Sequence, residues 1–214
     1  MATFERFELA EHQVNARGAK FCPLSSGGER VHLTFRSKAQ PLSTQWGPSS
    51  FDQNSTSTRC NFDFVCDDGL ASILKSLDVW ARAYLEKNSQ RLMGKALTSA
   101  QILDSYKPAH IERGSYPSQA RCKINLGGPR AVRCWDENGQ PRDPPSDWKS
   151  CRFVAKVNLS HLYIMSKEFG WVLNITDLHM FEESHVCPFV CGSNFKHLPV
   201  DVRAHNLRVD VRCS

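Results

Sequence analysis

The sequence predicts a β-rich α+β fold, in which a small antiparallel β-barrel packs against one long helix at about 67–88 and one short helix at about 98–106. Strand-like runs that alternate apolar and polar residues dominate positions 121–178. Apolar residues at helical spacing mark the long helix, and a capping-box pair opens the short one. At 214 residues the chain can bury one good core or two small ones.

In the first third of the chain, two short runs alternate apolar and polar residues and predict half-buried strands at 31–36 and 60–65. The segment between them, 37–59, is irregular and holds Pro41, Gly47 and Pro48. A loop of this length is usually functional or disordered.

The two helices have recognisable starts. Asp67 or Asp68 can cap the long helix by accepting a hydrogen bond from one of its first N–H groups. Thr98 and Gln101 form the capping-box pair of the short helix, which is expected to end before Pro108.

The second half of the chain predicts further strands at 120–126, 131–135, 151–159, 161–165 and 170–181. The Asn138-Gly139 turn follows the second of them. Pro141 to Pro145 is expected to lie outside any sheet, because proline cannot donate to a ladder. We assign residues 1–182 to a single domain and 183–214 to a Cys-containing C-terminal extension, in which 206–212 alternates like an edge strand.

Basic residues concentrate in one window. Between positions 113 and 156, nine basic residues stand against four acidic ones, an excess equal to the whole net charge of +5. A local excess of this kind favours a polyanionic partner. The alternative is an ordinary solvated surface of mixed charge.

Membrane and secreted classes are disfavoured. No run approaches the roughly 20 apolar residues that a membrane helix needs, so no membrane partner is expected. Acidic residues stand near the start, where a signal peptide has an apolar core, and this predicts an intracellular protein. The nine cysteines are an odd number, and most are expected to be free thiols in a reducing compartment.

Catalytic and metal motifs are weak, so we expect neither an enzyme nor a cofactor. The sequence has no P-loop and no Gly-x-Ser-x-Gly. Within each of the adjacent pairs Asp67-Asp68 and Glu182-Glu183, the two side chains would point to opposite faces of a strand, so one pair alone does not build a site. A nuclease site built from distant carboxylates stays open. A set with ligand types suited to zinc is His185, Cys187, Cys191 and His197. The alternative for this set, a loop with buried thiols, is the one we favour.

The basic window interleaves its cations with aromatic rings. Extended single strands need cations that follow the phosphates and flat rings on which bases stack. The candidate binding residues are Arg121, Lys123, Arg130, Arg133, Trp135, Trp148, Lys149, Arg152, Lys156, Tyr163 and Trp171. Each ring taken singly is more often part of a core, and Phe153 and Trp171 are the first candidates for that alternative.

Short motifs across roughly residues 40–180 resemble single-stranded DNA-binding proteins of large eukaryotic DNA viruses and their relatives. These motifs are Trp46–Phe51, Tyr106–Pro108, Tyr116-Pro117, Arg121–Asn125, Trp135–Gly139, Leu162–Ile164 and Lys167–Trp171. The resemblance implies an OB-like antiparallel β-barrel that binds single strands without sequence preference in DNA replication, repair or recombination. It also implies a location in the nucleus or at a viral replication site, and a binding role for Lys123, Tyr163 and Trp171.

We therefore expect residues 1–182 to form one OB-like domain whose partner is single-stranded DNA. RNA is an alternative partner, because discrimination rests on contacts to the 2′-hydroxyl that a sequence does not display. Self-association of the chain stays open. The alternative function is a structural or assembly subunit of a virion or larger complex, which would use the same surface for protein contacts.

Overall fold

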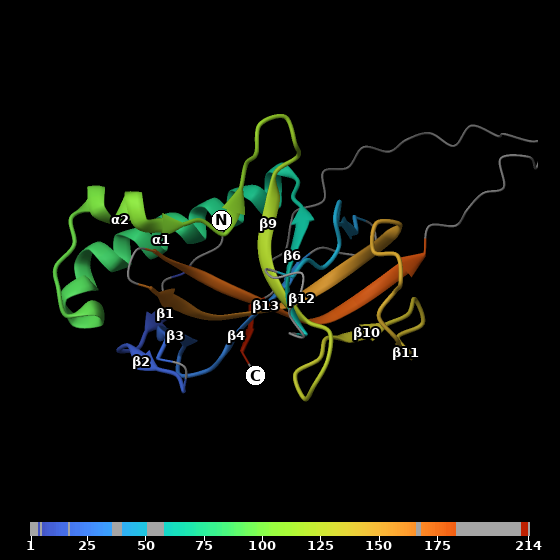
Figure 1. Ribbon diagram of the computed structural model, residues 1–214, viewed down its shortest axis with the longest axis horizontal. Helices are drawn as coiled ribbons and strands as arrows, with labels where there is room; N and C mark the ends of the chain where they lie inside the picture. Colours follow the sequence, from blue (N-terminus) through green and yellow to red (C-terminus); the bar gives the residue numbers. More distant parts are fainter. Residues whose placement is uncertain are drawn as a thin grey trace, which may run out of the picture.

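A long antiparallel hairpin organises the structure. Its strands, β12 (Cys151–Ile164) and β13 (Phe169–Glu182), run side by side along the molecule (Figure 1). The sequence predicted two strands where β12 is one, because the register shifts between Leu159 and His161 and interrupts the alternation. The computed structural model describes residues 4, 6–16, 18–35, 40–50, 58–165 and 168–182, together with the backbone of 211–213.

The other strands line both edges of this hairpin. On the β12 side, antiparallel pairing joins successive parts of that strand to β3 (Lys20–Ser26), β4 (Val31–Phe35) and β5 (Leu42–Ser43). On the β13 side, parallel pairing joins β7 (Tyr106–Lys107), β9 (Gln119–Asn125) and β10 (Arg133–Trp135).

Shorter or more peripheral strands complete the sheet. They are β1 (Phe7–Leu9) and β2 (Gln13–Val14) on β3, β6 (Arg59–Val65) and β8 (His110–Ile111) on β9, β11 (Pro141–Arg142) on β10, and β14 (Val211–Cys213) on β4. Pro141, expected outside any sheet, instead begins the short strand β11. The first position of a short peripheral strand is one that proline tolerates.

The sheet is open, which corrects the predicted closed barrel. It curves strongly, since the Phe64 ring of β6 lies 6.0 Å from that of Phe35 in β4 and 6.2 Å from that of Phe153 in β12. Among the described residues, however, β4 pairs with β12 and β14 and β6 pairs with β9, so no ladder closes the ring. An isolated bridge between Ser49 and Asn61 links β6 to the segment after β5. Alternation in a sequence shows which residues face the core but not which strands pair, and three strands parallel to β13 replace the expected antiparallel order.

Two helices follow β6, and both begin where the sequence predicted. Asp67 caps α1 (Asp68–Met93) by accepting a hydrogen bond from the Leu70 N–H at 2.9 Å. The helix continues past the predicted end at 88 and stops at Gly94, whose φ of 77° is left-handed. Thr98 and Gln101 make both bonds of the capping box that opens α2 (Ser99–Ser105). In the part of the chain that the structure describes, no helix is long and apolar enough to cross a membrane.

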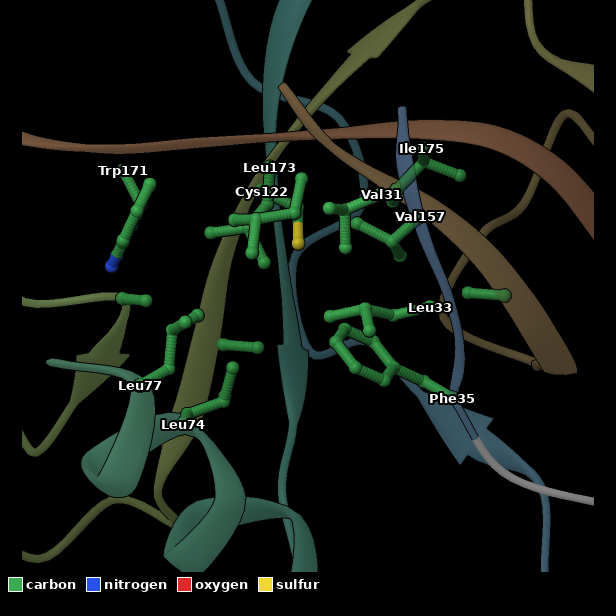
Figure 2. Packing of buried hydrophobic residues seen from close by; sticks show 14 of the residues in the cluster. Val31, Leu33, Phe35, Leu74, Leu77, Cys122, Val157, Trp171, Leu173 and Ile175 are labelled. Atoms are coloured by element: carbon green, nitrogen blue, oxygen red, sulfur yellow. The ribbon is translucent and has the colours of Figure 1, made fainter. Parts of the chain in front are cut away.

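The hydrophobic core lies on the inner face of the curved sheet. Leu74 and Leu77 of α1 point toward Trp171 and its neighbours on β9 and β13 (Figure 2). Farther along, Leu33 and Phe35 of β4 pack with apolar residues of β12 and β13 from the same inner face (Figure 2). The opposite face of the sheet carries the side chains that alternate with these buried residues along each strand.

A buried carboxylate fastens α1 to the segment that follows α2. Asp78 is 5% exposed and accepts hydrogen bonds from the Tyr106 hydroxyl at 2.6 Å and from the Ala109 N–H at 3.0 Å. Burial raises the pKa of Asp78, and these hydrogen bonds oppose that rise. The contact fixes β7 and β8, and through β8 it helps to position β9.

Candidate nucleic-acid interface

The outer face of the sheet, which points away from the core, carries three basic residues that we call the cation cluster: Arg59, Arg121 and Lys123. β6 and β9 pair antiparallel, which places Asn61 opposite Lys123 and Asp63 opposite Arg121. The residues that alternate with them along both strands are buried in the core. The cluster side chains therefore share one surface.

Lys123 is at the centre of the cluster. Its Nζ donates a hydrogen bond to Asn61 Oδ1, and its backbone lies beside Asn174 of β13. Arg59 reaches the same place, since its Nη2 donates to Asn174 Oδ1 at 3.2 Å. Burial, together with the positive charges of Arg59 and Arg121, lowers the pKa of Lys123 from 10.5 to about 8. Positive charge is thus crowded at this point, which favours the approach of an anion.

Asp63 faces the cluster from β6. Burial raises its pKa, and the charges of Arg113, Arg121 and Lys123 oppose that rise. Arg113 extends the basic surface, with its Nη2 at 3.7 Å from Asp63 Oδ2. On β6, β9, β10, β12 and β13, the described outer-face carboxylates are Asp63 and Asp177, fewer than the cations around them. The surface keeps a positive excess.

Three aromatic rings lie on the same face beside the cluster: Tyr163, His161 and Phe21. The pairing of β12 with β3 places Tyr163 opposite Phe21, and the Phe21 and His161 ring centroids are 5.1 Å apart at 62°. Burial, followed by the charge of Arg59, lowers the pKa of His161 to about 4. Burial and the neighbouring Glu168 raise the pKa of Tyr163 to about 12. All three rings are therefore uncharged at neutral pH, as suits contact with nucleobases.

At the other end of the outer face, an ion pair ties β10 to β13. Arg133 Nε and Nη2 lie 2.8 and 2.9 Å from the two oxygens of Asp177, and Trp135 Nε1 donates to Asp177 Oδ1 at 3.2 Å. Burial raises the pKa of Asp177, but the hydrogen bonds from these partners outweigh it and lower the pKa overall. The pairing of β12 with β13 sets Arg152 and Lys156 on the same face. At this end the ion pair with Asp177 engages Arg133, while Arg152 and Lys156 add positive charge to the same face.

Two tryptophans that the sequence analysis named as candidate binding residues do not lie on this surface. Trp171 is 5% exposed, and its ring stacks on Trp80 of α1 at 6.0 Å and 19°. Its predicted role in base stacking is therefore wrong, and the alternative of a core residue is confirmed, as it is for Phe153. Trp148 is half-buried and packs edge-on against the core residue Phe62 at 5.2 Å. It supports the core from a loop rather than presenting a ring on the outer face.

The remaining candidates fall in loops. Arg130 is exposed between β9 and β10. Burial lowers the pKa of Arg59 and the charge of Arg130 lowers it further, so Arg130 lies near the cluster. Lys149 is exposed in a turn where its N–H donates to Asp147 Oδ1 at 3.0 Å. Outside the described residues lie the zinc candidates His185, Cys187, Cys191 and His197. Within the described ranges, no three His, Cys, Asp or Glu side chains gather closely enough to hold a metal ion.

Three residues of this surface were not predicted from the sequence: Arg59, Phe21 and His161. Arg59 stands one position before the predicted strand 60–65, and its alternation with Asn61 and Asp63 was the signal that could have found it. Phe21 lies where no period was recognised. No local feature links it to His161, which is far away in the sequence.

Comparison with protein-family models and with curated protein sequences finds no match. Among solved structures, the chain is similar to gp2.5, a single-stranded DNA-binding protein encoded by bacteriophage T7. The two share 12% identity with a TM-score of 0.42, over 76% of this chain and 98% of that chain. A likeness this distant does not carry function from one protein to the other.

Proposed function

We propose that this protein binds single-stranded DNA on the outer face of its sheet, without sequence preference and without catalysis, in DNA replication, repair or recombination. The observation that carries the proposal is the cation cluster lying beside uncharged rings on one surface. Cations that follow the phosphates and rings that stack on bases are the two elements of single-strand binding. Contacts to phosphate fix a strand in place but read no sequence.

The polar residues between cations and rings suit the same role. Asn158 of β12 lies opposite Asn174 of β13 across the hairpin, and Asn61 of β6 lies opposite Lys123 of β9, the residue that pairs with Asn174. Side-chain amides can donate to phosphate or pair with base edges, so they accept many sequences. An outer face built of amides, cations and rings is polar and positively charged, as nucleic-acid interfaces are.

A titration of labelled oligo-dT by fluorescence anisotropy at two salt concentrations tests the proposal. Binding should weaken steeply as salt rises, because phosphate contacts release counterions. The double substitution Arg121→Ala, Lys123→Ala should weaken binding at low salt and reduce the slope of log K against log salt by about 1.4, at about 0.7 for each lost contact to a single strand. The matched control is Lys87→Ala, Lys95→Ala, which removes two exposed cations, one in α1 and one just after it, that belong to none of the strands carrying the cluster.

Each outcome has a definite meaning. No binding by the wild type at low salt, or equal binding at both concentrations, contradicts the proposal. An equal loss in the control variant would show that general charge, and not the cluster, attracts DNA. Tighter binding to oligo-rU than to oligo-dT would move the proposal to RNA.

A further inference from the structure

Two exposed rings that are absent from the predicted binding residues project from neighbouring loops. Trp46 follows β5 and is 59% exposed, and Tyr116 lies between β8 and β9 and is 58% exposed. Their ring centroids are 6.4 Å apart and their planes are inclined by 63°. Single exposed apolar residues are common on proteins, but two large rings in contact form a patch that suits a ligand.

The loop that carries the exposed indole is firmly held. The Thr44 hydroxyl donates to the Asp63 carbonyl oxygen at 2.8 Å and accepts the Gly47 N–H at 3.1 Å. One position on, Gln45 Oε1 accepts a hydrogen bond from Gln119 Nε2 of β9 at 2.9 Å. The ring is therefore presented on a pre-organised segment, so ordering it costs little when a ligand binds.

Trp148 supports this loop from below. Gly47 has a φ of +70°, and a Cβ atom there would lie 2.9 Å from Trp148 Cβ, so only glycine allows this close approach. Trp148 in turn packs on Phe62 of the core. The sequence predicted that Trp148 contacts the nucleic acid, whereas in the structure it packs against Gly47 in the loop that carries Trp46.

The two rings adjoin the cation cluster through Arg113. The Tyr116 N–H donates to the Arg113 carbonyl oxygen at 3.0 Å, so both residues belong to one turn. The Arg113 guanidinium lies 3.7 Å from Asp63, which stands opposite Arg121 in the sheet. Basic side chains therefore extend from Lys123 and Arg121 past Asp63 to Arg113 at the edge of the ring patch, where they outnumber the single carboxylate between them.

We propose that Trp46 and Tyr116 form a base-stacking site at the end of the cation cluster, where a bound single strand leaves the sheet. Because the rings are inclined, a base does not slot between them in parallel; it stacks on the open face of one ring while the other supports it. The adjoining Arg113 and Arg121 favour a nucleic acid over an apolar protein segment as the occupant. This site rests on the proposed function and adds to it a defined end of the binding path.

The double variant Trp46→Ala, Tyr116→Ala, titrated with oligo-dT of increasing length, tests the site. Short oligonucleotides that fit on the cation cluster should bind this variant as tightly as they bind the wild type. Long strands should bind about 5- to 150-fold more weakly, the effect expected from losing one stacked base. The variant Trp46→Phe, Tyr116→Phe keeps two rings and should recover most of this loss. Because both residues are exposed, thermal unfolding should be unchanged in either variant.

Equal binding of the alanine variant at every length would overturn the site, and so would an equal loss at every length, since neither result marks an end of the path. Lost self-association or partner binding with unchanged DNA binding would identify the rings as a protein contact and also overturn it. A wild type that binds no strand at all overturns the proposed function itself. A wild type that binds while the alanine variant matches it overturns the ring site alone.

Discussion

Lys123 should make DNA binding weaken as pH rises above neutrality. In the free protein, burial and the charges of Arg59 and Arg121 hold its pKa at about 8. A phosphate group beside the three cations stabilises the charged amine and moves that pKa back toward 10.5. The bound pKa then exceeds the free pKa, so binding takes up a proton in the window between them. Affinity must fall as protons become scarcer in that window.

The size of the effect follows from these two pKa values. If phosphate restores the full difference, linkage predicts a Kd that is nearly constant below about pH 7 and rises about tenfold between about pH 7 and 9. A tenfold change corresponds to about 1.4 kcal/mol of binding free energy. Lys123 keeps part of its surface in water, and screening by solvent makes tenfold an upper limit.

Anisotropy titrations of oligo-dT at constant ionic strength, from about pH 6 to 9, measure this dependence. Lys123→Arg is the control, because a guanidinium stays charged throughout the range and the variant retains any pH effect that belongs to the oligonucleotide. The wild type should lose affinity with rising pH more steeply than the variant does. A variant that loses affinity as steeply as the wild type, or a wild type whose affinity stays constant, would refute proton uptake by Lys123.

Two further predictions concern stability, measured by urea denaturation. Trp171→Ala should lower the free energy of unfolding by about 3–5 kcal/mol, because it empties a core position against Trp80. The folded variant should bind DNA as the wild type does, and weakened binding by folded protein would argue against a purely structural role. Asp78→Ala should cost about 2–4 kcal/mol, since it leaves the buried Tyr106 hydroxyl without its acceptor, whereas the exposed helical control Asp104→Ala should change stability by less than about 0.5 kcal/mol. Similar losses in the two aspartate variants would count against the buried contact.

The local signals of the sequence were accurate where a few neighbouring residues decide the structure. Asp67 and the Thr98–Gln101 pair started the two helices as predicted, because a cap needs only the N–H groups of the following turn. Alternation also predicted the strand at 120–126, which the structure has as β9 with Arg121 and Lys123 on its outer face. The same reasoning divided β12 in two, because a bulge breaks the period without ending the strand.

What the sequence alone determined is the kind of surface: strands with one apolar and one polar side, and a window rich in cations and rings. Tertiary structure decided which of these residues meet. The pairing of β6 with β9 brings Arg59 near Lys123, and Trp171 packs inward against α1. The Trp46 ring contacts Tyr116, which lies in a loop far away in the sequence. Strand pairing depends on contacts summed over distant segments, which no short pattern encodes. For the same reason the strands could be foreseen, while the open edge of the sheet and the approach of Arg59 to Lys123 could not.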